Sequence, residues 1–135
     1  MSKDLTYTQE YREMEDNPVF SKALVFSVRI VNLYKCLRDE RCETVMSKQI
    51  LRSGTSIGAN ISEALASEST DDFVHKLSIS LKEGNETKYW ILLLHRTGFI
   101  NDEENNSILS DCQELRKLIG AIIRTAKRNK DAHQS

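Results

Sequence analysis

Few residues of this chain are spaced like the ligands of a metal site. Asp72 and His75 form one Asp-x-x-His unit, whereas a di-metal site in a helical bundle takes glutamates from two helices and an ExxH pair from each of the others. Glu83 and Glu86 are the one close acidic pair of the third predicted helix, and a magnesium cluster would need several such pairs. We therefore expect no metal and no other cofactor, and an all-helical metal hydrolase is the least favoured interpretation.

The cysteines form no pattern typical of a catalytic or structural site. Cys36, Cys42 and Cys112 include no CxxC pair, and one thiol is left over under any pairing. This spacing argues against a zinc ribbon and against a disulfide framework. Cys112 lies within an apolar helical stripe, so we interpret it as a buried core residue. No cysteine lies near a histidine in the sequence, and Ser, His and Asp form no constrained arrangement, so we predict that the chain is not an enzyme.

The basic residues suggest a different chemistry, the binding of phosphate groups. The net charge is only -1, but residues 20–56 carry seven Lys and Arg against three Asp and Glu, whereas residues 57–86 carry two against six. Cations gathered on one surface can bind the backbone of RNA or DNA. The alternatives are ordinary solvated helix faces, or attraction between the basic part of one subunit and the acidic part of another. The candidate nucleic-acid-binding residues, expected to form one patch, are Arg38, Arg41, Lys48, Arg52, Arg124, Lys127 and Arg128.

Long helices must position these residues, because the sequence lacks the frequent glycines and prolines that form the turns of a β-rich chain. The chain has one proline and five glycines, and they separate segments whose apolar residues recur at helical spacing. These segments predict helices over about residues 18–38, 48–67, 70–97 and 102–130. Short links between them predict an all-α fold, an antiparallel up-down-up-down four-helix bundle over residues 18–130. We expect residues 1–17 to form a polar N-terminal arm and residues 131–135 a C-terminal tail.

Polar residues before each predicted helix are suited to accept its free backbone N–H groups. The candidate N-caps are Asn17, Ser47, Ser69 and Asn101, the last with Glu104 three residues later as in a capping box. Gly98 follows the third helix and is the candidate left-handed residue at its C-terminal end.

Two of the predicted helices carry more apolar surface than a monomeric bundle needs. The first has two apolar stripes, and the third is hydrophobic nearly all round at its C-terminal end. A second copy of the chain could cover this surface, and an unusually broad core stripe is the alternative for the first helix. We expect a homo-oligomer whose candidate interface residues are Phe26, Ile30, Tyr89 and Trp90.

The second predicted helix contains small residues that helix propensity alone would not favour. Gly54 and Gly58 stand one turn apart, and each glycine costs about 1 kcal/mol against alanine in a helix. Their spacing lets another backbone approach closely and gain dispersion contacts. We expect tight packing inside the bundle here, and a ligand cleft is the alternative.

Length and composition bound the class of protein. A chain of 135 residues suits a single domain with one core. The sequence has no run of about 18 apolar residues and no basic leader followed by an apolar segment. We therefore expect a soluble, cytoplasmic protein without a membrane partner.

Two blocks of the sequence resemble a known family. The first is Gln49–Ala64, QILRSGTSIGANISEA, and the second is Asp72–Trp90, DFVHKLSISLKEGNETKYW, followed by Thr97–Ile100. Both are similar to blocks of the bacterial four-helix-bundle proteins that are encoded by intervening sequences within 23S ribosomal RNA genes. Together they cover most of residues 47–100.

The resemblance implies an antiparallel four-helix bundle that assembles into a homopentamer with a central channel. It also implies kinship with the accessory variability proteins of diversity-generating retroelements, whose basic pentamers bind nucleic acid and a reverse transcriptase. The expected partners are therefore further copies of the chain, RNA or DNA, and a reverse transcriptase or other protein. Many family members carry proline at the position of Gly58, and the accessory proteins are more basic than this chain. The family-motif residues, which we interpret as structural, are Gly54, Gly58, Asn60, Glu63, Glu83 and Glu86.

Overall fold

The computed structural model describes residues 16–134 of the chain. Within this range it contains four helices and no strand: α2 (Pro18–Asp39), α3 (Met46–Leu65), α4 (Thr70–Arg96) and α5 (Asp102–Gln134). The prediction of an all-α fold is confirmed. Most of the predicted N-terminal arm lies outside the described residues. None of the four helices is apolar enough over a sufficient length to cross a bilayer.

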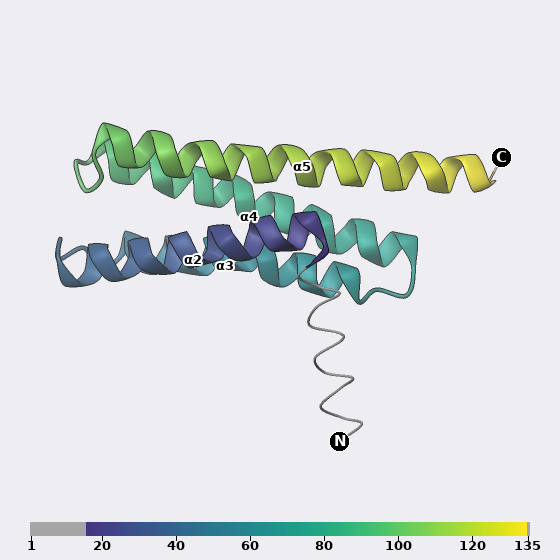
Figure 1. The fold of residues 1–135 in the computed structure, drawn as a ribbon, viewed down its shortest axis with the longest axis horizontal. Coiled ribbons are helices and arrows are strands. Elements are labelled where there is room, and N and C mark those ends of the chain that lie inside the picture. Colours follow the sequence, from purple (N-terminus) through teal and green to yellow (C-terminus); the bar gives the residue numbers. More distant parts are fainter. Residues whose placement is uncertain (1–15, 135) are drawn as a thin grey trace, which may run out of the picture.

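Helices that follow one another in the chain pack side by side and run in opposite directions (Figure 1). Contacts between α2 and α5 close the four helices into an up-down-up-down bundle. These two helices touch less than the other neighbouring pairs, and shallow grooves follow the seam between them. α5 is the longest helix, and its C-terminal end extends past the turn between α3 and α4 (Figure 1).

The core consists mainly of isoleucine and leucine side chains from all four helices. Between α3 and α4 it also contains small hydroxyl groups. The Thr87 hydroxyl donates to Ser53 Oγ over 2.9 Å, and the Ser80 hydroxyl donates to the carbonyl of Ile57 over 2.8 Å. Because these buried hydroxyls have partners, they cost little to remove from water. The fully buried apolar side chains include Ile30, Leu37, Ile50, Ile57, Ile61, Leu77, Ile91, Leu94, Leu115 and Ile119.

Three of the four predicted N-caps are confirmed. Asn17 Oδ1 accepts two N–H groups of the first turn of α2, at 3.1 and 3.2 Å, and Ser69 Oγ accepts one of α4 at 3.1 Å. Asn101 and Glu104 form the predicted capping box, with reciprocal bonds of 2.8 and 3.0 Å. Gly98 has a φ of +82°, as expected for a left-handed residue after a helix.

The prediction of Ser47 as the N-cap of the second helix is wrong. α3 begins at Met46, two residues earlier than predicted, and Ser47 is buried inside its first turn. The cap is the carboxylate of Glu43, which accepts the N–H groups of Val45, Met46 and Ser47 over 3.1, 2.9 and 2.6 Å. A glutamate set back from the helix can reach three N–H groups at once, and a short serine side chain at the helix start cannot.

The helix α5 continues beyond its predicted end. Residues 131–134, expected as a tail, extend the helix to Gln134. No glycine or proline lies between Lys127 and Gln134, so the local sequence contains no strong helix breaker there.

Candidate nucleic-acid interface

Two of the predicted binding residues in the first half of the chain are paired with acidic neighbours. Arg41 donates to both carboxylate oxygens of Glu104, over 3.0 and 2.7 Å, and to the carbonyl of Phe99 over 2.6 Å. Arg38 donates twice to the carboxylate of Asp39, over 2.7 and 2.9 Å. The Arg41 pair joins the link between α2 and α3 to the start of α5, so its role within the chain is structural.

Arg52, a third candidate, bridges two glutamates of the family motif. Its guanidinium lies 3.2 Å from a carboxylate oxygen of Glu83 and also pairs with Glu86. The indole N–H of Trp90 donates to the same Glu86 carboxylate over 3.0 Å. The indole N–H and then the guanidinium hold the pKa of Glu86 below its ordinary value. This network links α3 to α4, and a phosphate would have to displace the glutamates to reach Arg52.

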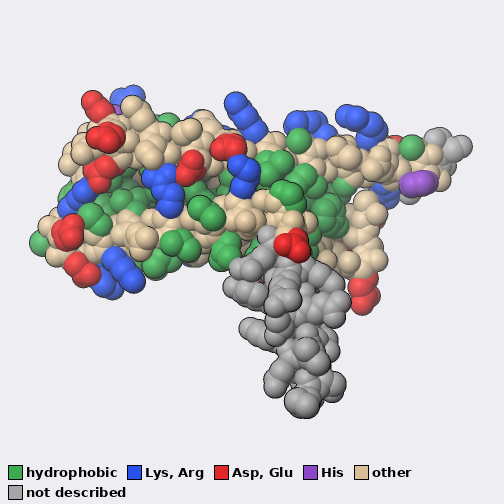
Figure 2. Space-filling model, in the orientation of Figure 1, with side chains coloured by type: hydrophobic (Ala, Val, Ile, Leu, Met, Phe, Trp, Pro, Cys, Tyr) green, Lys and Arg blue, Asp and Glu red, His purple; other side chains and the backbone are tan. Residues whose placement is uncertain are grey.

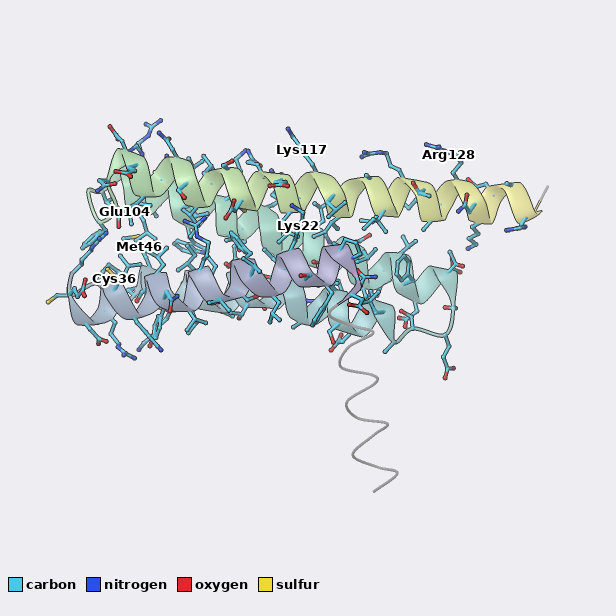
Figure 3. The ribbon with its side chains drawn as sticks, in the orientation of Figure 1. Lys22, Cys36, Met46, Glu104, Lys117 and Arg128 are labelled. Atoms are coloured by element: carbon cyan, nitrogen blue, oxygen red, sulfur yellow. The ribbon has the colours of Figure 1, made fainter. Side chains whose placement is uncertain are left out.

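The prediction of a single basic patch is wrong, because the seven candidates fall into two groups at opposite ends of the bundle. Glu104, the partner of Arg41, lies at the start of α5, whereas Lys130 pairs with Asp71 near the end of that helix. Arg128 follows Glu104 by 24 residues of one helix, or about 36 Å. Figure 3 shows Glu104 at one end of the molecule and Arg128 toward the other. The antiparallel topology separates the groups, since α5 begins beside the end of α2.

The second group belongs to a basic stretch of α5. Residues 115–130 contain six Lys and Arg and no Asp or Glu. Four of the six are exposed and take part in none of the ion pairs formed among residues 16–134: Lys117, Arg124, Lys127 and Arg128. We refer to these four residues as the basic ridge.

The basic ridge follows the outer side of α5. Lys117, Arg124 and Arg128 are seven and four residues apart, a spacing that aligns them on one helical face. Figure 2 shows Lys and Arg side chains along the edge of the molecule that α5 occupies, and in Figure 3 the labelled Lys117 and Arg128 point away from the other helices. The ridge is therefore open to a ligand as large as a nucleic acid.

Sequence reasoning missed Lys117 as a member of this group. The signal that could have found it is the absence of acidic residues from 16 consecutive positions, 115–130, which is visible in the sequence itself. Neighbouring Arg116 is turned toward α4, where its Nε donates to Asn85 Oδ1 over 2.8 Å. Lys48, at the other end of the bundle, is exposed, and the nearby candidates Arg38 and Arg41 are paired.

The prediction that Phe26 and Ile30 form a subunit interface is wrong. Their exposed fractions are 2% and 0% within the single chain, because the second apolar stripe of α2 packs into the bundle. The apolar surface that α2 does expose is formed by Leu24, Val25 and Val28.

The other two predicted interface residues lie side by side on α4. Tyr89 is 57% exposed and Trp90 is half-buried. Their ring centres are 5.1 Å apart with an angle of 73° between the planes, an edge-to-face contact.

The remaining family-motif residues are engaged in packing or in pairs within the bundle. Gly54 and Gly58 face α2. The Asn60 amide donates to the Ser56 carbonyl of its own helix over 2.8 Å, and Glu63 pairs with Lys76 of α4 at 3.1 Å. Across residues 16–134, no three His, Cys, Asp or Glu side chains gather as the ligands of a metal ion.

The environments of two cysteines keep their thiols protonated. Cys112 lies in the core, as predicted, and burial raises its pKa to about 11. Burial and then the contact of its Sγ with a Glu40 oxygen, at 3.2 Å, hold the pKa of Cys36 above its ordinary value. Since the thiolate is the nucleophilic form, neither environment activates the sulfur.

Comparisons with known proteins agree with this architecture. A family model described as 23S rRNA-intervening sequence protein matches residues 15–121 of the chain. A crystal structure from Bacteroides thetaiotaomicron, described as a protein of unknown function from the S23 ribosomal protein family, is 58% identical and has a TM-score of 0.79. That match covers 82% of this chain and 99% of the other chain. The comparison with curated proteins found no match.

Proposed function

The chain belongs to the family of 23S rRNA-intervening sequence proteins, and on this premise we propose that it is a nucleic-acid-associated accessory protein. In this proposal it is a non-enzymatic, homo-oligomeric helical bundle of five copies that acts in the cytoplasm. The kinship with retroelement accessory proteins that the family resemblance implies adds a reverse transcriptase as the protein partner to test.

The observation that carries the proposal is the basic ridge. Its four cations are exposed, and no acidic residue lies among them between positions 115 and 130. A local excess of positive charge attracts a phosphate backbone even when the net charge of the whole chain is -1. The ridge thus provides a surface for nucleic acid that does not depend on the paired residues Arg38, Arg41 and Arg52.

Exposed apolar side chains support the homo-oligomer. Val25 and Val28 are 61% and 54% exposed on α2, and Tyr89 is exposed on α4. A further copy of the chain that covered such surface would gain about 25 cal/mol for each Å² of apolar area removed from water.

A scaffold that binds only protein is the second candidate. The observation in its favour is that three of the seven predicted cations are neutralised by acidic residues of the same chain. In this alternative the charges of the basic ridge bind acidic surfaces of another protein, or of another copy, and nucleic acid is not bound.

A fluorescence-anisotropy titration distinguishes the two candidates. The full chain is titrated into labelled structured RNA and duplex DNA at about 50 and 200 mM salt. We expect binding at the lower salt that weakens strongly at the higher. The variant Arg124→Glu, Lys127→Glu, Arg128→Glu should lower the affinity by more than about tenfold, because three phosphate contacts become repulsive.

The control variant changes the charge by the same amount elsewhere. Lys35→Glu, Lys82→Glu, Arg96→Glu reverses three exposed cations that lie outside α5. We expect it to bind nearly as tightly as the wild type. If the wild type and the α5 variant bind with equal affinity, the basic ridge does not bind nucleic acid. If the wild type does not bind at about 50 mM salt, the protein-binding scaffold is favoured.

A further inference from the structure

Resting on the proposed function, we propose that the basic ridge binds the phosphate backbone of double-stranded nucleic acid in preference to single strands. Three observations carry this inference: the density of positive charge along α5, the lack of aromatic residues on that helix, and the small side chains between the cations.

The charge density of α5 matches a duplex better than a single strand. The four cations of the basic ridge, from Lys117 to Arg128, extend over about 17 Å of helix, and no acidic residue lies among them. A duplex presents one phosphate charge per about 1.7 Å of its axis, twice the density of a single strand. A rigid row of cations therefore meets more phosphates on a duplex, whose geometry is also rigid.

α5 itself has no platform on which bases could stack, and Phe73 of α4, which lines a groove with Ala121 and Thr125, is partly buried and packs against the core. Single-strand-binding surfaces combine cations with aromatic side chains, each worth about 1–3 kcal/mol per stacked base. Residues 102–134 contain no Phe, Tyr or Trp. The exposed aromatic residue Tyr89 lies on α4, four residues after Asn85, which contacts Arg116. Because α4 and α5 are antiparallel, Tyr89 lies on the side of Arg116 away from the ridge, and one ring could stack on only one base.

Several residues between the cations have small side chains, which project little from the surface of α5. Gly120 and Ala121 lie between Lys117 and Arg124, and Thr125 lies between Arg124 and Lys127. A Cβ atom on Gly120 would lie 3.4 Å from a guanidinium nitrogen of Arg124, so the Arg124 side chain lies along the helix surface. A phosphate backbone can approach the surface between the cations closely.

The test compares ligands of equal length with the full chain. Labelled 20-nucleotide duplex DNA, duplex RNA and single-stranded oligo(dT) are titrated by fluorescence anisotropy between about 50 and 200 mM salt. Four phosphate contacts on one ridge predict that duplex affinity falls at least about 150-fold over this range. Replacing Arg124, Lys127 and Arg128 by glutamine should reduce that fall to about fourfold, since Lys117 alone remains. We expect duplex binding at least about tenfold tighter than oligo(dT) binding, and the tighter of the two duplexes identifies the nucleic acid.

The variant Tyr89→Ala tests the stacking argument. We expect its affinity for every ligand to equal that of the wild type. Tighter binding of oligo(dT) than of both duplexes, or a loss of affinity in Tyr89→Ala, would overturn the inference and leave the proposed function standing. Absence of binding to all three ligands at the lowest salt would overturn the proposed function itself.

Discussion

At the residue scale, the two glycines of the family motif meet α2 at different distances. A Cβ atom on Gly54 would lie 2.8 Å from both Cγ atoms of Ile30, which is closer than packed side chains allow. A Cβ atom on Gly58 would lie 3.4 Å from Ser27 Oγ and 3.5 Å from the Ala23 Cβ, an ordinary contact. The close approach of α2 to α3 therefore requires glycine at position 54 and only tolerates it at position 58.

The glycine pair predicts opposite effects of the same substitution. Gly54→Ala should lower the free energy of unfolding by about 1–3 kcal/mol, because the fully buried Ile30 has no room to move away. Gly58→Ala should raise it by up to about 1 kcal/mol through better helix propensity. Urea unfolding followed by circular dichroism measures both. A neutral Gly54→Ala would show that α2 and α3 pack less tightly than the structure has them.

At the scale of the element, the start of α3 depends on a residue outside the helix. The buried carboxylate of Glu43 accepts three backbone N–H groups and its own backbone carbonyl accepts the Ser47 hydroxyl over 2.9 Å. Burial alone would raise the pKa of Glu43, but the three N–H groups together outweigh it and hold the pKa below its ordinary value. The cap is therefore strongest when Glu43 is ionised.

The lowered pKa of Glu43 predicts a pH-dependent contribution to stability. This contribution is fully present above the unfolded pKa, about 4.3, and is lost as the pH falls through the folded value. Glu43→Gln should lower the free energy of unfolding by about 1–3 kcal/mol at pH 7 and by less as the pH approaches about 3. Urea titrations across this pH range measure the difference. The control Glu68→Gln, at an exposed site between α3 and α4, should show little difference at any pH, and a Glu43→Gln deficit that did not shrink in acid would contradict the cap.

At the scale of the whole molecule, three of the exposed apolar side chains are close together on α2. Leu24, Val25 and Val28 form one exposed group beside the seam with α5, where a groove is lined by Val25 and Leu115. Phe26, which lies between them in the sequence, points into the core. A subunit contact through α2 would therefore be formed by the two valines, whereas Phe26 would stay in the core of each single chain.

The assembly predicts a change in particle mass. Val25→Glu with Val28→Glu should shift the protein from an oligomer toward its 15.5 kDa monomer while it stays helical, because two carboxylates would be buried at the contact. Size-exclusion chromatography with light scattering measures the mass. Val45→Glu, at a residue 72% exposed before α3, is the control and should keep the wild-type mass. A wild-type protein that is monomeric would contradict the proposed oligomer.

Sequence periodicity was sufficient for the fold and for most helix ends. The apolar spacing predicted each of the four helices, and Asn17, Ser69 and Asn101 were found as caps because their partners lie within three residues. Apolar spacing and capping hydrogen bonds between residues a few positions apart depend only on the local geometry of the helix, which is the same in every helix. Glu43 escaped prediction because glutamate is not one of the residue types preferred as an N-cap, although the N–H groups it accepts lie only two to four residues ahead.

The candidate site and the interface depended on tertiary structure. The sequence showed which residues are basic, but only the packing of helices far apart in the chain decided that Arg41 and Arg52 meet glutamates and that the basic ridge does not. The same holds for Phe26 and Ile30, which are buried in the bundle, Ile30 beside Gly54 of α3 and Phe26 next to the seam with α5. The periodicity of the sequence determines whether a helix face is apolar or charged. Which surface packs against that face depends on contacts between distant segments, and the local sequence does not determine these contacts.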